Sequence, residues 1–600
     1  MGSTSRAACF IPWLCIFAAL QCAPVERTSA APSRLDAGLD EFLAHGDAQF
    51  DPRVGLLRER FRNPGYHSRV PSGETVHPTR ESLYYAVALL QRGDADDVAR
   101  AVRIVRTILP LQDADGDSPT HGVWPWLYEE PLEEMADPDL NWADFCGSSL
   151  AQVLARHSAA LPGDLRDEVR AALRRAAEAI RARDVGPAYT NIAILGGGVC
   201  AAAGELLDDD DLLAYGRDRL RKVVAHTARH GSFNEYNSPP YTTVALLECE
   251  RTLMLVRDPA TRAAAESLRR TAWKIIAGSF HPGTQQWAGP HSRNSRDRLR
   301  RSTVDFLRRR MGEPIALHPE MSEADPPRGH EIVPPLPCPE HLADRFRRAP
   351  DDDPAPERQR VRTYIAGDTP DTSTIGTSWF APDACLGSAN RSTFWAQRRP
   401  LLGYWRTVSD PAVVFRARFL HDGRDFVSMG IRAAQRGPRV LAGIGSVAGR
   451  GDWHPSLDRP ADGTFHVRDF RLRFELTGTG VHAEELGEGR YALVAGERRV
   501  VIHTRPSRFA GEAVTWSVGH AMGSAHVDAI CHDGPPRAFD FRRPLDIDLI
   551  VGIELSTSDR EPISEPPRVV RVDDAHRATW PTPAGEPLSL NIGPESFEGL

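Results

Sequence analysis

Two patterns of apolar residues divide the chain. From about residue 35 to 312, apolar side chains recur at helical spacing (i, i+3, i+4, i+7), and Gly, Pro or Asp separate one segment from the next. The predicted helices are 80–92, 96–109, 146–158, 164–183, 190–206, 210–229, 240–256 and 259–279. Short connections between such helices favour antiparallel hairpins, and about eight to twelve paired helices form a toroid or a solenoid. Because no repeat of fixed length is visible, we predict an α/α toroid in the form of an incomplete barrel.

Beyond residue 360 the apolar period falls to two. Short segments rich in β-branched residues alternate with Gly, Asp or Pro. Examples are 413–420, 470–478 and 490–496. Many such strands predict antiparallel sheets, packed as a β-sandwich or as stacked sheets.

The two patterns predict two domains and a connection between them. We expect the toroid to span residues 31–312 and the β domain to span 361–600. Residues 313–360 are rich in proline and acidic residues, which predicts a linker. The cleft where the two domains meet is the expected functional site.

Residues 1–30 have the pattern of an export signal. Arg6 precedes the apolar run 7–20, which is too short to span a bilayer comfortably, and no later segment approaches ~20 apolar residues. We therefore expect a secreted or periplasmic protein with no stable membrane span. Cys22 could accept a lipid, but Gln21 and Ala19 make a poor lipidation site.

The composition is that of a globular protein, with 41% hydrophobic and 26% charged residues. The net charge of −8 argues against a nucleic-acid partner. Among the 73 basic residues, Lys222 and Lys274 are the only lysines. Arginine supplies rigid forks that suit carboxylate or sulfate groups, although a bias in base composition explains the same excess. The oligomeric state is not indicated.

Three polar and aromatic clusters interrupt the helical region, at 189–191, 230–241 and 287–297. Their candidate residues are Asn191, Glu235, Tyr236, Tyr241, Trp287, His291, Arg293 and Arg296. Asn191 either caps the helix that follows it or acts in a site. In the third cluster an aromatic ring, an acid–base group and guanidinium groups lie in one segment, which favours a binding or catalytic surface.

A family resemblance follows from the second cluster. GSFNEYNSPPY resembles the G-x-Y/F-x-E-x-S-P-x-Y loop of heparinase II/III-like polysaccharide lyases, with one extra residue after Glu235. The resemblance implies that Tyr241 is the catalytic acid–base, while the insertion leaves Tyr236 as a competitor. It also implies that Asn191, which matches the Asn of an Asn-His pair in that family, neutralises the substrate carboxylate. Ile192 stands in place of the family's His.

Two further segments carry the resemblance. HDGRDFVS resembles the H-x-H-x-D-x-L-S signature of the same family, in which His421 and Asp425 align. Gly423 replaces the second His, a metal ligand in that family, so we expect no cofactor. A divalent metal held by His421, Asp422 and Asp425 remains the alternative. GPHSRNSR resembles the Arg-bearing segment of chondroitin AC and hyaluronate lyases.

The resemblance implies an exported lyase that cleaves a uronic-acid-containing polysaccharide, an anionic partner, by β-elimination. Asn191, with Arg293 or Arg296, would hold the carboxylate and stabilise the enolate-like transition state. The ordinary pKa of tyrosine is about 10, so we expect nearby arginines to lower it and make Tyr241 both base and acid.

If the proton and the leaving group lie on opposite faces of the sugar, a second proton-transfer group is needed. His291 or His421 would supply it, because the ordinary pKa of histidine suits acid–base catalysis.

Three alternatives stay open. A glycoside hydrolase needs two carboxylates across the bond that it cleaves, and no pair is singled out by its setting. The available carboxylates are Glu129, Glu130, Asp144 and Glu235. A carbohydrate-binding protein would use Trp124, Trp142 and Trp287 for stacking, although Trp124 and Trp142 fill the toroid core equally well. An epimerase would begin with the same loss of the C5 proton.

Overall fold

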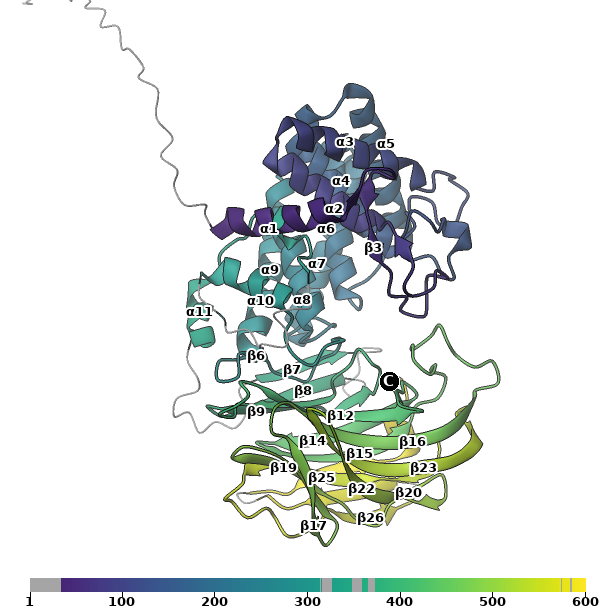
Figure 1. Ribbon diagram of the computed structural model, residues 1–600, viewed down its shortest axis with the longest axis vertical. Coiled ribbons are helices and arrows are strands. Elements are labelled where there is room, and N and C mark those ends of the chain that lie inside the picture. The colour runs from purple at the N-terminus through teal and green to yellow at the C-terminus, as the bar shows by residue number, and fades with distance from the viewer. Residues whose placement is uncertain are drawn as a thin grey trace, which may run out of the picture.

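The computed structural model describes residues 34–312, 315, 326–347, 359–364, 373–573, 575–582 and 585–600. The expected export signal at 1–30, with Cys22, lies outside these residues. A helical half precedes a half made of sheets, and the two lie against each other end to end (Figure 1). The predicted fold class, helical toroid and then antiparallel sheets, is confirmed.

The helical domain is built from four antiparallel hairpins. They are α2 (Thr79–Arg92) with α3 (Ala95–Ile108), α4 (Asn141–His157) with α5 (Gly163–Arg183), α6 (Thr190–Leu207) with α7 (Asp210–His230), and α8 (Pro239–Leu255) with α9 (Pro259–Ser279). The first helices of successive hairpins pack on one another as an inner layer, and their partners cover them on the outside. Helix α1 (Arg34–Gln49) packs on α2, and α10 (Arg301–Met311) packs on α8. All eight predicted helices are present, and α4 begins five residues earlier than predicted.

Helix α6 is the most apolar helix of this domain. Within the described residues it is the one helix long and apolar enough to cross a membrane, and 89% of its 18-residue window is buried inside the protein. Helices α4, α7 and α8 surround it, which explains why its sequence is apolar on every face. The first turn of α6 carries Asn191, so the core of the toroid fixes the position of this candidate residue.

The β domain consists of two large antiparallel sheets. One has the order β22 (Thr515–Ala521), β23 (Ser524–Asp540), β16 (Thr464–Thr477), β12 (Val413–His421), β11 (Leu401–Trp405), β9 (Ala384–Ala389), β8 (Ser373–Phe380) and β7 (Gln359–Tyr364). The other has the order β10 (Arg391–Thr393), β14 (Met429–Arg436), β15 (Arg439–Ser446), β25 (Ile550–Thr557), β19 (Arg498–His503), β18 (Arg490–Ala495) and β17 (His482–Gly487). Apolar side chains of both sheets share one core, which includes Phe415, Phe474, Ile444 and Val500. A small sheet of β26 (Arg568–Val572), β27 (Ala575–Trp580) and β28 (Leu588–Ile592) packs on the second sheet.

The described part of the expected linker is a strap on the helical domain. Ile332 is fully buried, and its carbonyl accepts hydrogen bonds from Gln91 Nε2 (2.8 Å) and Gln152 Nε2 (2.6 Å). Further along, α11 (Glu340–Arg347) packs on α9. A few apolar side chains within this proline-rich sequence therefore bind the described part of the linker to the toroid.

The segment 287–298, which precedes α10, joins the two domains. His291 and Arg399 exchange two backbone hydrogen bonds of 3.0 Å, and Ser378 Oγ donates to the Gly289 carbonyl at 2.6 Å. The carboxylate of Asp297 pairs with the guanidinium groups of Arg399 and Arg416. These contacts hold one face of the first sheet, from β8 to β12, against the helical domain.

We expect Gly387→Ala to weaken the contact between the domains. A Cβ at Gly387 of β9 would overlap the Gly289 carbonyl, a backbone group that cannot rotate away. Overpacking of this kind costs about 1–3 kcal/mol, so calorimetry should show a lower melting temperature and separate domain transitions. Gly403→Ala on the neighbouring strand β11 is the control, because its closest neighbours are 3.1 Å away within the same sheet. Equal melting curves for the two variants would contradict the packing described here.

Candidate active site

The loop before α8 positions Tyr241. Ser238 caps the helix, because its Oγ accepts from the Tyr241 backbone N–H at 3.3 Å and donates to the Arg293 carbonyl at 2.5 Å. Two prolines follow the cap, where the missing N–H groups cost nothing. Tyr241 therefore lies in the first turn of α8, fixed against the segment 287–298.

Asn237 ties this loop to the same segment. Its Nδ2 donates to the carbonyls of Ala288 and Pro290, both at 2.8 Å, and its Oδ1 accepts from Trp287 Nε1 at 2.5 Å. Asn237 has a positive φ of 44°, which asparagine tolerates better than most residues. Trp287 is 1% exposed, so its ring is part of the packing and cannot stack on a sugar.

Arg293 stands at the centre of the candidate site. Its Nη2 donates to the Tyr241 hydroxyl at 2.9 Å and its Nη1 to Glu235 Oε1 at 3.1 Å. Both Nε (3.2 Å) and Nη2 (3.0 Å) donate to Gln397 Oε1 of the β domain. The guanidinium carbon also lies 4.1 Å from the centre of the Tyr241 ring. One arginine thus links a phenol and a carboxylate from the loop region before α8 with an amide from the β domain.

Asn191 contacts the other oxygen of the same carboxylate. Its backbone N–H and its Nδ2 donate to Glu235 Oε2 at 2.8 and 2.6 Å. The helix cap of α6 is Tyr189, so the interpretation of Asn191 as a cap is wrong. The structure therefore brings together four of the predicted residues, namely Asn191, Glu235, Tyr241 and Arg293.

The pKa of Tyr241 lies above its ordinary value. Burial raises the pKa, and the nearby charge of Glu235 raises it further, while the charge of Arg293 lowers it. Burial outweighs the guanidinium, so the expectation that arginines would lower this pKa on balance is wrong. Tyr241 is a neutral phenol at neutral pH, and Arg293 stabilises its phenolate when that forms.

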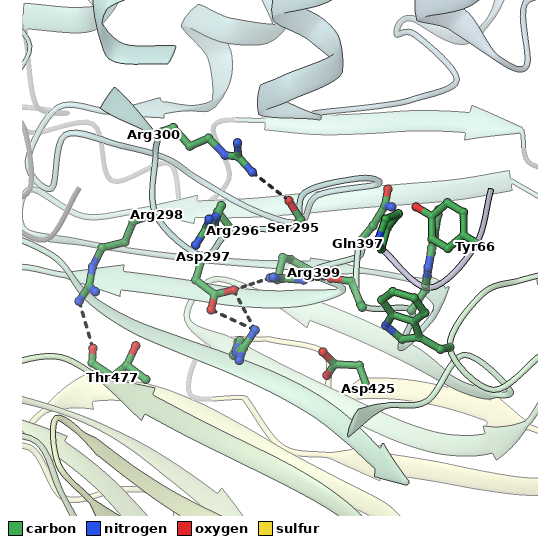
Figure 2. A pocket seen from close by; sticks show the side chains of 15 residues that line it. Tyr66, Ser295, Arg296, Asp297, Arg298, Arg300, Gln397, Arg399, Asp425 and Thr477 are labelled. Atoms are coloured by element: carbon green, nitrogen blue, oxygen red, sulfur yellow. Dashed lines mark hydrogen bonds and ion pairs between the residues drawn. The ribbon is translucent and has the colours of Figure 1, made fainter. Parts of the chain in front are cut away.

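Two adjoining cavities meet beside Gln397, which binds Arg293. A cavity of about 600 Å³ lies at the domain interface, and one of about 500 Å³ lies inside the toroid with Tyr241 on its wall. Ser295, Arg300 and Gln397 line both cavities. Figure 2 shows the first cavity, with the exposed Arg296 among its lining residues.

The two histidines expected to transfer protons lie elsewhere. His291 is 1% exposed, its Nε2 donates to the Trp287 carbonyl and its Nδ1 accepts from Asn294 Nδ2, both at 3.0 Å. Burial lowers the pKa of His291 to about 3, so it is a neutral packing residue. His421 packs on aromatic rings of the β domain and hydrogen-bonds Asp452 at 2.9 Å. Neither histidine lines either cavity.

The remaining aromatic candidates are part of the core. Trp124 and Trp142 are buried, and their indole N–H groups donate to the Ile108 carbonyl and to Thr79 Oγ1, both at 3.1 Å. Tyr236 is 4% exposed, and burial raises its pKa to about 12. Core packing therefore explains all three, which removes Tyr236 as a competitor of Tyr241.

The alternative of a metal held by His421, Asp422 and Asp425 finds no support among the described residues. Asp425 pairs with Arg418 at 2.6 Å, and no group of three or more His, Cys, Asp or Glu suited to a metal occurs in the part of the chain that is described.

Three other residues of the site were missed by sequence reasoning: Tyr66, Trp395 and Gln397. Tyr66 and Gln397 line the interdomain cavity together, and the ring centre of Trp395 lies 5.3 Å from the guanidinium carbon of Arg293. No motif marks these residues, because only the folded domains bring them together.

Comparison with known proteins gives two kinds of match. Residues 39–304 match a family model described as a domain of unknown function (DUF8769). No curated protein matches the sequence. Among solved structures, heparinase III has 11% identity and a TM-score of 0.43, with 95% of this chain and 92% of that chain covered. Chondroitin AC lyase of Streptomyces coelicolor A3, in complex with chondroitin sulphate, has 13% identity and a TM-score of 0.45, with 92% and 84% covered.

An alginate lyase in complex with a tetrasaccharide has 14% identity and a TM-score of 0.26, with 50% of this chain and 94% of that chain covered. These three structural neighbours are polysaccharide lyases. Their likeness concerns the arrangement of the chain and assigns no role to any of its residues. The roles proposed below therefore rest on the geometry of this molecule alone.

Replacement of Arg293 should change the ionisation of Tyr241. We expect Arg293→Gln to raise the pKa of Tyr241, because the variant loses both the positive charge and the hydrogen bond to the phenol oxygen. Tyrosinate absorbance is measured against pH, and the same titration with Tyr241→Phe in each background isolates this tyrosine from the others. An unchanged or lowered pKa in Arg293→Gln would contradict the described contact.

Proposed function

We propose that this protein is an exported lyase that cleaves a uronic-acid-containing polysaccharide by β-elimination. The observation that carries the proposal is the shared Nη2 group of Arg293, which contacts the Tyr241 hydroxyl and also, with Nε, binds the oxygen of Gln397. A group bound in place of Gln397 would lie directly beside the phenol. The expectation of export rests on the pattern of residues 1–30.

Gln397 Oε1 stands where a carboxylate of the substrate would bind. It is a neutral acceptor that takes two N–H groups of a guanidinium and faces both cavities. Arginine binds carboxylates with two parallel hydrogen bonds, and charged acceptors bind about twice as strongly as neutral ones. A uronate carboxylate would therefore displace Gln397 from the Nε and Nη2 edge of Arg293.

Glu235 and Asn191 act behind this contact. Glu235 uses one oxygen for Arg293 and the other for Asn191, and its side chain is 8% exposed. The carboxylate thus fixes the guanidinium plane and offsets its charge in a partly dry site. The expected direct role of Asn191 is revised, because its amide holds Glu235, which in turn orients the group that binds the substrate.

The proton transfers follow from this placement. With the carboxylate on Arg293, the C5 hydrogen next to it lies on the side of Tyr241. The phenolate of Tyr241 takes this proton, the C5–H electrons form the C4–C5 double bond, and the bond from C4 to the leaving oxygen breaks. The phenolate that starts this cycle is the fraction of Tyr241 that has released its proton to solvent. The tyrosine then passes the C5 proton to the leaving oxygen and is again a phenolate, so no oxidant or second proton donor is needed. Arg293 stabilises the negative charge in both the phenolate and the enolate-like transition state.

The other enzyme class finds less support in the structure. The carboxylates named above for a hydrolase are held by other residues. Glu235 binds Asn191 and Arg293, and Glu129 pairs with His77. Asp144 is buried beside Arg219. Glu130 accepts a hydrogen bond from the Arg69 backbone. None of these four side chains lines either cavity, so none of the pairs among them can flank a bound glycosidic bond. The glutamates that do line the toroid cavity are Glu59, Glu81 and Glu248.

We expect Tyr241→Phe to lower turnover by about 10³-fold without loss of the fold, because general acid–base groups contribute on this scale. The assay follows the ultraviolet absorbance of the new double bond across a panel of alginate, glycosaminoglycans, glucuronan and rhamnose-glucuronate polymers. Since the pKa of Tyr241 is raised, the fraction of phenolate grows with pH, and wild-type turnover should rise about tenfold per pH unit below that pKa. Retention of the wild-type rate by Tyr241→Phe would remove this tyrosine from the reaction. Products without the ultraviolet absorbance would instead indicate a hydrolase, and an unchanged chain length with altered C5 configuration would indicate an epimerase.

The exchange of Gln397 has its own test in Gln397→Glu. This nearly isosteric change places a permanent carboxylate on Arg293, which competes with the substrate. Hydrogen bonds to charged groups contribute about 1.5–3 kcal/mol, so KM should rise roughly tenfold or more while the melting temperature holds or increases. Gln397→Ala is the matched control, since it removes the competing group and should lower KM. If both variants change KM in the same direction, Gln397 does not occupy the carboxylate position.

A further inference from the structure

Two loops from different domains meet at one end of the interdomain cavity. One is the loop between β3 (Glu59–Arg60) and β4 (Thr75–Val76) of the helical domain, which points toward the sheets in Figure 1. The other follows β15 of the β domain. The Tyr66 ring of the first loop lies 5.7 Å from Trp453 and 5.0 Å from His454 of the second. We call these residues, Tyr66, Trp453 and His454 together with Gly65, the clasp.

Gly65 shows how closely the two loops approach. Its backbone has a φ of 90°, which favours glycine, and a Cβ there would lie 2.7 Å from Trp453 Cζ3. On the other side, His454 contacts Trp395 at a ring separation of 5.8 Å. The clasp is thus a continuous wall of rings from the helical domain to the floor of the cavity.

The clasp lies next to the proposed reactive group. Tyr66, Trp453 and Gln397 line the interdomain cavity. In Figure 2, Tyr66 and Gln397 occupy one end of the cavity, while Arg298 and Thr477 lie at the other. The cavity therefore extends unequally from Gln397, the residue bound to Arg293: the clasp lies at the near end, and the cavity continues in the other direction.

The interdomain cavity is rich in arginine. Five arginines and two aspartates line the cavity as a whole, and two of these arginines also pair with carboxylates outside the lining, Arg416 with Glu475 and Arg298 with Asp410. Asp297 is already paired with Arg399 and Arg416, and Asp425 is paired with Arg418. Arg296, on the side of the cavity away from the clasp, is exposed. A chain that carries several negative groups would be attracted to this side of the reactive group and not to the closed side.

We propose that the clasp makes the site act on the ends of an anionic polysaccharide, with the chain lying along the arginine-lined side and a short terminal piece held between Arg293 and the clasp. This inference rests on the proposed lyase function. An interior segment of a polymer that follows the interdomain cavity would have to continue through the position of Tyr66 and Trp453. The clasp therefore decides whether cleavage releases small terminal products or divides the chain at internal bonds.

The first test is the size of the products over time. Wild-type protein is incubated with whichever uronate polymer of the panel it cleaves, and samples are separated by size with ultraviolet detection. We expect small unsaturated products from the earliest samples while the remaining polymer keeps nearly its full length. An early ladder of long oligosaccharides, with a rapid fall in viscosity, would overturn the proposal.

The second test changes the clasp itself. Trp453→Ala removes the ring that meets Tyr66, and we expect the share of long oligosaccharides among early products to rise several-fold. Trp453→Phe keeps a ring in place and should restore the wild-type product sizes. Tyr66→Phe keeps the ring of Tyr66 and loses only its hydroxyl, so it should also give small products. Product size is informative here because a merely structural loss of stability would change the rate and not the length distribution. Wild-type product sizes from Trp453→Ala would overturn the role of the clasp.

A binding measurement separates this inference from the lyase proposal. Oligosaccharides of the same polymer are labelled with a bulky fluorophore at one end or at the other and titrated into Tyr241→Phe. We expect one label to weaken binding at least tenfold and the other to leave it nearly unchanged, with the difference lost in Trp453→Ala. Equal affinity for both labels would overturn the clasp proposal even if the protein is a lyase. Unequal affinity without unsaturated products from the wild type would instead refute the lyase function and leave the end-binding site.

Discussion

The site depends on one guanidinium that serves three partners from two other parts of the chain. Arg293 holds the Tyr241 phenol, the Glu235 carboxylate and the Gln397 amide at hydrogen-bond distance. Glu235 keeps the arginine oriented, and burial keeps Tyr241 protonated at neutral pH. Because Glu235 and Tyr241 lie in and just after the loop before α8, while Gln397 lies in the β domain, the geometry exists only when this loop, the segment 287–298 and the β domain are all in place.

The domain interface and the site are therefore formed by the same segment of the chain. The segment that carries Arg293 also exchanges backbone hydrogen bonds with Arg399 and binds Arg416 through Asp297. Gln397 lies two residues before Arg399, so the contact that joins the domains also sets the distance from Gln397 to the guanidinium. A shift of the sheets relative to the toroid would move the amide away from Arg293 and open the clasp at the same time.

Much of the fold was predictable from the sequence, because apolar periods report directly on helices and strands. Strand β23 is hard to recognise in the sequence, because Gly534 and two prolines interrupt its pattern; the strand tolerates them where it extends beyond its pairing with β22. The four central residues of the site were predicted because three short segments contain them. The burial of Trp124 and His291 could not be predicted, because the sequence pattern around a tryptophan or a histidine is the same whether the side chain lies in a core or in a cleft. The direction of the pKa shift of Tyr241 depends on its burial, which no local sequence pattern indicates. Tyr66 and Gln397 reach the site only through tertiary contacts, so no local pattern predicts that they belong to it.

The Gln397 amide that binds Arg293 also affects which sugars the site can select. A hydroxyl of a neutral sugar would exchange one neutral acceptor for another, so it gains little by displacing Gln397, whose amide is already in place. A carboxylate exchanges a neutral acceptor for a charged one in a partly dry site, where that difference is large. A sugar must therefore bind Arg293 more strongly than Gln397 does in order to displace it. A uronate carboxylate meets this requirement, and an uncharged sugar ring does not. Selectivity for acidic sugars then comes from the group that must be displaced as much as from the arginine that attracts them.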